Sequence, residues 1–299
     1  MLTSRVARAR AGLTLAELLI ALAVAGIVLA LLAAISVREQ RAFSDLADRA
    51  ALAGQLREAS AILPVDLRAL SPALGDVRDA RDTAVEVRAT IASGVVCDTA
   101  ANALILPPPI ADSSALYATS IGAVSPGDTA WLLDTGDSAS TWRPFAVTLA
   151  GATRAGQCAA GGPHLSPTIA AQPRGQLTVS GSIPGGAVGS PLRVTRPMRY
   201  SIYRASDRAW YLGARDWNAA AMRFNTIQPV AGPLLSVAAG GVAFGYRDSA
   251  GSPLAMPVVN GSSIRMVDIV LRGQTRSART LSTGPQRDSA HIMIALRNR

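Results

Sequence analysis

The sequence contains no lysine, because all 29 basic residues in its 299 positions are arginine. A chain without lysine cannot carry a P-loop lysine, a Schiff-base lysine or the serine–lysine pair of the S-x-x-K hydrolases, so these chemistries are excluded. Only two histidines and two cysteines are present, and they do not have the spacing of a metal site. We therefore expect no catalytic residues, no cofactor and no metal site in this chain.

Aromatic residues make up only 4% of the chain and charged residues 16%, whereas 49% of the residues are hydrophobic. This composition is too apolar for a disordered chain and too irregular for a collagen or coiled-coil repeat. The length allows one large domain or two small ones. The formal charge of +9 would suit an acidic partner, but arginine without lysine is more simply explained by codon bias than by nucleic-acid recognition.

The N-terminus combines a basic segment with a long apolar one. Residues 1–12 contain three arginines and no acid, and residues 13–35 contain only two clearly polar side chains, those of Thr14 and Glu17. As a helix the apolar segment would be roughly 34 Å long, enough to cross a bilayer. The arginines should stay on the cytoplasmic side, which places the rest of the chain outside.

Three interpretations of this segment compete. A secretory signal peptide would have its A-x-A cleavage site after Ala23 or Ala25, but the apolar run continues about ten residues further. A plain membrane anchor explains the length but not Glu17. A carboxylate at membrane depth costs a few kcal/mol, so Glu17 is expected to have a function.

The third interpretation explains both features. Residues 12–18, with the sequence GLTLAEL, resemble the type IV prepilin cleavage motif of bacterial pilins and type II secretion pseudopilins. The resemblance implies that a prepilin peptidase cuts between Gly12 and Leu13 and methylates the new terminal amine, which makes residues 1–12 a leader peptide. The family usually has phenylalanine or methionine where this chain has Leu13.

Glu17 would be the fifth residue of the mature chain. In a bundle of such helices its carboxylate can meet the terminal amine of a neighbouring subunit, and only the correct axial stagger allows this pairing. Glu17 would then set the register of assembly. The alternative is a carboxylate that reaches the lipid headgroups near the helix end.

The predicted fold class is α+β, with a long N-terminal helix packed on an antiparallel sheet, as in pilins. Apolar positions at helical spacing extend the helix over residues 13–63, of which 13–35 cross the membrane, and Pro64 should end or kink it. Residues 64–299 form a periplasmic globular domain, in which alternating segments such as 84–91, 199–204 and 265–272 predict strands. The composition of residues 97–172 predicts a loop-rich insert.

The only cysteines, Cys97 and Cys158, would lie in the oxidising periplasm and are expected to form a disulfide. Closing a loop of about sixty residues would stabilise the fold by ~4 kcal/mol in the chain-entropy model. Two free thiols are the alternative.

The large predicted domain points to a subgroup within this family. A cysteine after a strand, a Gly/Pro-rich insert with a second cysteine, and the ending IALRNR at 294–299 resemble PilW-type minor pilins and pseudopilin J. This resemblance implies a subunit that primes or caps a type IV pilus or a type II secretion pseudopilus. The implied partners are the prepilin peptidase, other minor pilins or pseudopilins, the major pilin and inner-membrane lipid. The implied location is a single pass through the inner membrane, followed by the filament tip.

Two alternatives come from other functional classes. The first is a membrane-anchored periplasmic enzyme or binding protein. The second is a DNA-binding tip pilin, suggested by a basic strip with interleaved aromatics: Arg193, Arg196, Arg199, Arg204 and Arg208. Cross-strand pairs between arginine and carboxylate explain that strip more simply, so nucleic acid is not expected as a partner. A calcium site at Asp128, Asp134 and Asp137 is likewise less favoured than ordinary Asp-Gly turns.

Overall fold

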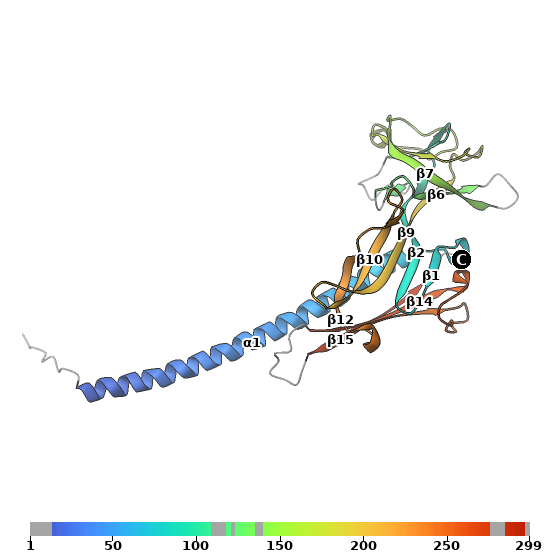
Figure 1. The fold of residues 1–299 in the computed structure, drawn as a ribbon. Helices are drawn as coiled ribbons and strands as arrows, with labels where there is room; N and C mark the ends of the chain where they lie inside the picture. Colours follow the sequence, from blue (N-terminus) through green and yellow to red (C-terminus); the bar gives the residue numbers. More distant parts are fainter. Residues whose placement is uncertain (1–13, 109–117, 121–122, 135–139, 276–284, 297–299) are drawn as a thin grey trace, which may run out of the picture. The chain divides into compact units, whose positions relative to one another are not determined.

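We describe a computed structural model of the chain, which covers residues 14–108, 118–120, 123–134, 140–275 and 285–296 (Figure 1). The chain divides into two compact units. One contains residues 1–51 and 275–286, and the other contains residues 52–274 and 287–299. Each unit is considered by itself below.

Helix α1 runs from Leu15 to Arg68 and is the only long helix in the described part of the chain. None of its residues up to Ala51, where the first unit ends, is buried. The second unit begins at Leu52, from where the helix buries one face. Phe43 and Leu46, which belong to the same helical apolar pattern as the buried leucines, precede this point and are 71% and 59% exposed.

The predicted end of the helix at residue 63 is wrong, because α1 continues through Pro64 to Arg68. Proline inside a helix costs about 3 kcal/mol. Leu63 and Leu67 lie on either side of the proline and are both fully buried. Burial of each leucine side chain stabilises the fold by roughly 2 kcal/mol. Packing of the last two turns therefore offsets the cost of the proline.

The rest of the second unit is mostly sheet, with a few short helical turns. The strands are β1 Val77–Ala80, β2 Ala84–Val95, β3 Asp98–Ala100, β4 Ala103–Leu106, β5 Ala118–Ser120, β6 Thr129–Asp134, β7 Thr141–Thr153, β8 Arg174–Val179, β9 Pro191–Arg204, β10 Trp210–Asn218, β11 Arg223–Phe224, β12 Gln228–Leu234, β13 Val242–Arg247, β14 Met266–Gln274 and β15 Arg287–Ala295. The short helices are η1 Pro72–Leu74, α2 Pro167–Ala170, η2 Val237–Ala239 and η3 Gly261–Ser263.

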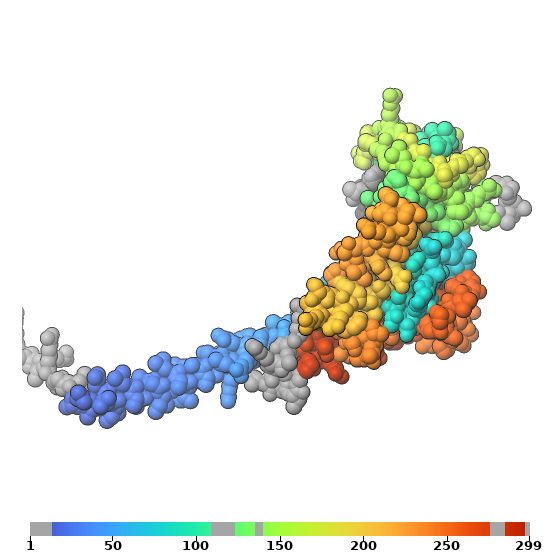
Figure 2. Space-filling view, viewed as in Figure 1, coloured from blue at the N-terminus to red at the C-terminus, as the bar shows by residue number. Residues whose placement is uncertain are grey.

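All the strand pairs in the described residues are antiparallel, as predicted. The main path is β13-β14-β12-β10-β9-β6-β7-β8-β4-β3, and the other strands join it as branches. Strand β9 organises this sheet. It pairs with β2 along one edge, and on the other edge its first half pairs with β6 and its second half with β10. Figure 2 shows β2, β9 and β10 side by side at the surface, in cyan, gold and orange.

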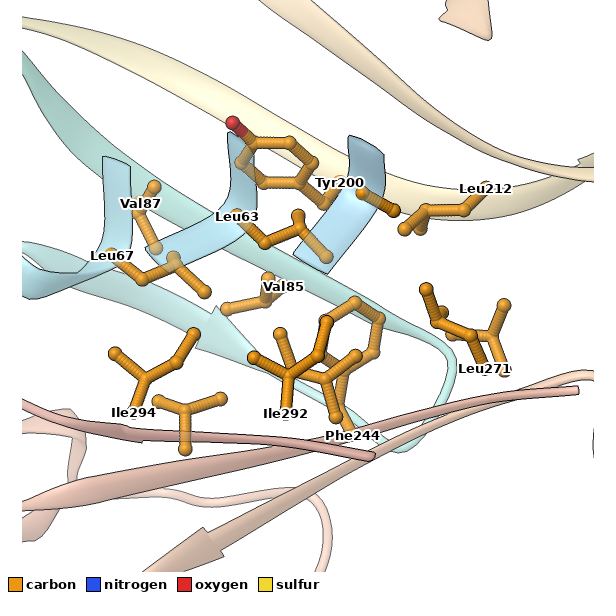
Figure 3. Close-up of a cluster of buried hydrophobic side chains, with 14 of the residues drawn as sticks. Leu63, Leu67, Val85, Val87, Tyr200, Leu212, Phe244, Leu271, Ile292 and Ile294 are labelled. Carbon is orange, nitrogen blue, oxygen red and sulfur yellow. The ribbon is translucent and has the colours of Figure 1, made fainter. Parts of the chain in front are cut away.

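The larger hydrophobic core lies where the end of α1 packs on the sheet. Figure 3 shows Leu63 and Leu67 of the helix directed towards side chains from β2, β9 and the C-terminal strands. The labelled strand residues in this core are Val85, Val87, Tyr200, Leu212, Phe244, Leu271, Ile292 and Ile294. The predicted packing of the helix on a sheet is thus confirmed from Leu52 onwards.

A hydrogen bond between side chains supports this packing. The hydroxyl of Tyr200 on β9 donates to Oδ2 of Asp66 in the last turns of α1. Burial of Tyr200, together with the charge of Asp66, raises the pKa of the Tyr200 hydroxyl well above its usual value. The hydroxyl therefore stays protonated at neutral pH and keeps its role as donor.

The segment predicted as a loop-rich insert, residues 97–172, instead supplies β3 to β7. It builds a second core around side chains such as Leu104, Leu132 and Val147. The sequence predicts short strands within this segment, near residues 104–106, 131–133 and 145–149, and these lie in β4, β6 and β7. The full length of β7 was not predicted, because most of the strand is exposed and small or polar residues replace the usual hydrophobic alternation. The predicted disulfide between Cys97 and Cys158 is present.

We predict that Leu63→Ala lowers the free energy of unfolding by about 2–5 kcal/mol, because the side chain is fully buried and leaves a cavity. The matched control is Ile62→Ala, since Ile62 is 40% exposed on the same helical turn. Tryptophan fluorescence during denaturant unfolding of the whole chain measures this, because Trp131, Trp142, Trp210 and Trp217 all lie in the second unit. Equal losses in the two variants would contradict the described packing.

Candidate functional site: the N-terminal processing and membrane segment

The start of α1 is built around one threonine and one glutamate. The backbone N–H and the hydroxyl of Thr14 both donate to Oε2 of Glu17, each at 3.0 Å. In return the backbone N–H of Glu17 donates to Oγ1 of Thr14 at 3.3 Å. This reciprocal arrangement is a capping box, which satisfies backbone donors that a helix start otherwise leaves unpaired.

The capping box uses only half of the Glu17 carboxylate. Oε2 accepts both hydrogen bonds from Thr14, and no residue within the described ranges donates to Oε1. The Thr14 contacts hold the side chain in place, because they fix its rotamer against the first turn. Oε1 is thereby left available to a donor from outside the chain.

The first part of the helix, up to Ala51, is not covered by any of the described residues. Most large apolar side chains along this part are more than half exposed, for example Leu15 at 78%, Ile20 at 64% and Leu29 at 65%. The helix is long and apolar enough to cross a membrane. So much apolar surface in water is unfavourable, which suggests a membrane anchor.

Residues 7–33 match the family model described as the prokaryotic N-terminal methylation motif. The match supports a type IV pilin-like protein. The motif implies processing by a prepilin peptidase and assembly with other pilins, and together with the apolar helix it fits a single-pass inner-membrane protein. No curated protein and no solved structure matches the chain.

The predicted cleavage residues, Gly12 and Leu13, fall within the matched segment but outside the described residues. Glu17 lies at the helix start, as expected. The capping role of Thr14 was not among the expectations from the sequence, because the motif resemblance assigns no role to this residue. The signal for it was present, since a threonine followed three residues later by a glutamate before an apolar run is the sequence pattern of a capping box.

The arginine strip on β9 does not form one continuous basic surface. Alternation along the strand separates Arg196 from its neighbours Arg193 and Arg199, and each of the three faces a carboxylate. Nε of Arg204 donates to the backbone oxygen of Arg208 at the turn between β9 and β10. Pairs between arginine and carboxylate, the simpler of the two interpretations, thus account for the strip along the strand.

Arg193 makes the most buried of these pairs. Its guanidinium donates to both carboxylate oxygens of Asp76 at 2.7 and 3.0 Å, and Asp76 is fully buried. The backbone N–H of Ser71 also donates to Asp76, at 2.7 Å. The rings of Trp131 and Trp142 lie 5.3 and 5.7 Å from the guanidinium. This cluster ties the segment that leaves α1 to the middle of the sheet.

The aspartates considered for calcium are also paired with arginine. Asp128 accepts two hydrogen bonds from Arg196, at 2.7 and 2.8 Å. Asp134 forms an ion pair with Arg143, with 2.7 Å between the charged atoms. Asp137 lies outside the described residues. Within the described ranges, no group of three His, Cys, Asp or Glu residues could hold a metal ion.

We predict that Thr14→Val speeds hydrogen exchange of the Glu17 backbone amide by roughly 2- to 30-fold, because loss of a helix cap costs about 0.5–2 kcal/mol. Valine keeps the shape of threonine without its hydroxyl, and Thr14→Ser keeps the hydroxyl as the control. NMR of the whole chain in detergent micelles measures the exchange. Identical rates in the Val and Ser variants would show that the capping box contributes nothing.

We also predict that Arg193→Met lowers the free energy of unfolding by about 3–5 kcal/mol, because it leaves Asp76 buried without its partner. Arg204→Met removes an arginine from an exposed position of the same strand and should change stability by less than about 0.5 kcal/mol. Adding Asp76→Asn to Arg193→Met should restore part of the loss. A single Arg193→Met variant as stable as the control would contradict this assignment.

Proposed function

We propose that the chain is a minor pilin or pseudopilin, a structural subunit that primes or caps a type IV pilus or a type II secretion pseudopilus. One observation carries the proposal: a carboxylate held in place by Thr14 opens an uncovered apolar helix, inside an N-terminal methylation motif. A plain anchor has no need of such a carboxylate.

The proposed sequence of events begins in the inner membrane. The prepilin peptidase cleaves between Gly12 and Leu13 and methylates the Leu13 amine, which stays positively charged. In the assembled filament, that amine donates to Oε1 of Glu17 in a neighbouring subunit. The pairing offsets the cost of both charges in an apolar environment, and it does so only at one axial stagger.

The large second unit favours a position at the filament tip. This unit contains residues 52–274 and 287–299. A globular unit of this size is difficult to pack along the side of a filament, where many copies lie next to one another. It is easier to accommodate at the tip, where few copies pack side by side. The resemblance to PilW-type minor pilins and pseudopilin J points the same way. In this proposal the globular unit lies in the periplasm, and its partners are other minor subunits and the major pilin.

We assign no catalytic step to the chain itself. The prepilin peptidase supplies the covalent chemistry, and the most buried carboxylates, Asp76 and Asp128, hold the fold together through arginines. These ion pairs hold distant segments of the chain together, as a structural subunit requires.

The experiment that tests the proposal compares Glu17→Ala with Glu39→Ala in cells that assemble the filament. Glu39 is an exposed acid further along the same helix, so its loss is the matched control. Glu17→Ala should leave cleavage after Gly12 intact but reduce the amount of chain in the sheared filament fraction by about tenfold or more, because an unpaired terminal amine is costly in lipid. Equal recovery of the two variants in filaments would contradict the proposal.

A further inference from the structure

The sheet face that points away from the α1 core carries a second cluster of charge. Val87, Tyr200 and Leu212 point into that core, so the residues between them on β2, β9 and β10 point the other way. Arg199 on β9 lies directly opposite Glu86 on β2 and Arg215 on β10. We call this surface the arginine face and define it by Arg78, Glu86, Arg88, Arg199 and Arg215.

The arginine face has four guanidinium groups and a single carboxylate, that of Glu86. Glu86 is shared between Arg78 at 3.6 Å and Arg199 at 3.8 Å, distances too long for hydrogen bonds. The nearby Asp79 is already held by Arg81 through two bonds of 2.9 and 3.0 Å. The face therefore has an excess of positive charge that its own carboxylate does not balance.

Arg215 is the least compensated of these residues. Among the described residues it makes no ion pair, and its guanidinium lies 5.4 Å from the centre of the Phe224 ring. The Nε atoms of Arg199 and Arg215 are both buried without a hydrogen-bond partner. Unpaired buried donors of this kind cost free energy, because they have lost water and gained nothing in return.

The arrangement is also unfavourable in its electrostatics. Like charges directly opposite each other across two antiparallel strands destabilise a sheet, and Arg199 and Arg215 are such a pair. On the same face, burial lowers the pKa of Arg88 and the charge of Arg78 lowers it further, whereas the charge of Asp76 acts in the opposite direction. An anionic partner that meets the exposed guanidinium nitrogens of this face would balance its excess of positive charge.

We infer that the arginine face binds an acidic protein surface, whose aspartate or glutamate carboxylates pair with Arg199 and Arg215. Arginine guanidinium groups match carboxylates with two parallel hydrogen bonds, and the side chains of Arg199 and Arg78 are 29% and 46% exposed. This inference concerns the second unit alone, so it can hold or fail independently of filament assembly.

A carboxylate partner suits the face better than a nucleic acid does. A phosphate backbone is tracked by a continuous basic stripe, and the neighbouring arginines that would extend such a stripe, Arg193 and Arg196, are taken by Asp76 and Asp128. The face is therefore a compact patch with alternating donors and one acceptor.

The test uses the whole chain purified in a neutral detergent and a fluorescent poly-L-glutamate peptide as the probe. The double variant Arg199→Gln/Arg215→Gln should weaken binding by about tenfold or more, the effect of losing two charge-assisted pairs. The control Arg154→Gln/Arg287→Gln removes the same charge from exposed positions on other strands or loops and should change binding by less than about twofold.

Three results would overturn the inference: no binding by the wild type, equal losses in both double variants, or preferential binding of a single-stranded DNA probe of the same charge. A further variant keeps the test sharp if the double variant folds poorly. Glu86→Gln leaves every arginine in place and removes the competing carboxylate, so it should tighten peptide binding by about two- to fivefold. Weaker binding in Glu86→Gln would contradict the assignment.

Discussion

The apolar first part of helix α1 is not covered by the described part of the protein, and the proposed function depends on this exposure. No residue of α1 between Leu15 and Ala51 is buried, although this stretch begins with the most apolar part of the chain. A membrane would cover such a surface with lipid, and in the proposed filament other helices would take the place of the lipid. Within that environment the Glu17 carboxylate is the one strongly polar feature of the first turns, and Thr14 fixes where it points.

The same helix enters the core of the second unit without a break. Leu63 and Leu67 are fully buried there, and Asp66 binds Tyr200 on the central strand β9. Beyond the helix, Asp76 continues the attachment through Arg193. The last turns of the helix are therefore fixed within the second unit by packing and by a hydrogen bond, and the apolar part of the helix is continuous with them in the chain.

Much of this could be predicted from the sequence, because the strongest signals are local. Short local patterns predict the apolar run with its leading arginines and the alternation of β2, β10, β13 and β14. These patterns can be recognised without any knowledge of the rest of the fold. The pairing of Cys97 with Cys158 followed from there being only two cysteines in an oxidising compartment. These expectations needed no knowledge of long-range contacts.

The rest depended on contacts between distant residues. The helix passes Pro64 because Leu63 and Leu67 meet strands far away in sequence. Strand β7 extends beyond the predicted residues 145–149 because β6 pairs with its first half and β8 with its second half. The ion pairs Asp76–Arg193 and Asp128–Arg196 join positions more than sixty residues apart. Thr14 is the exception, since its capping pattern is local and could have been recognised.

The proposed function requires that the chain is processed at its N-terminus and then relies on Glu17. Intact-mass and N-terminal peptide mass spectrometry can detect this processing in chain isolated from membranes that contain an active prepilin peptidase. We expect a mature chain that begins at Leu13 and carries one methyl group on its amine. A chain that begins at Met1, or one cut after Ala23 or Ala25, would contradict it and leave only a tethered globular unit.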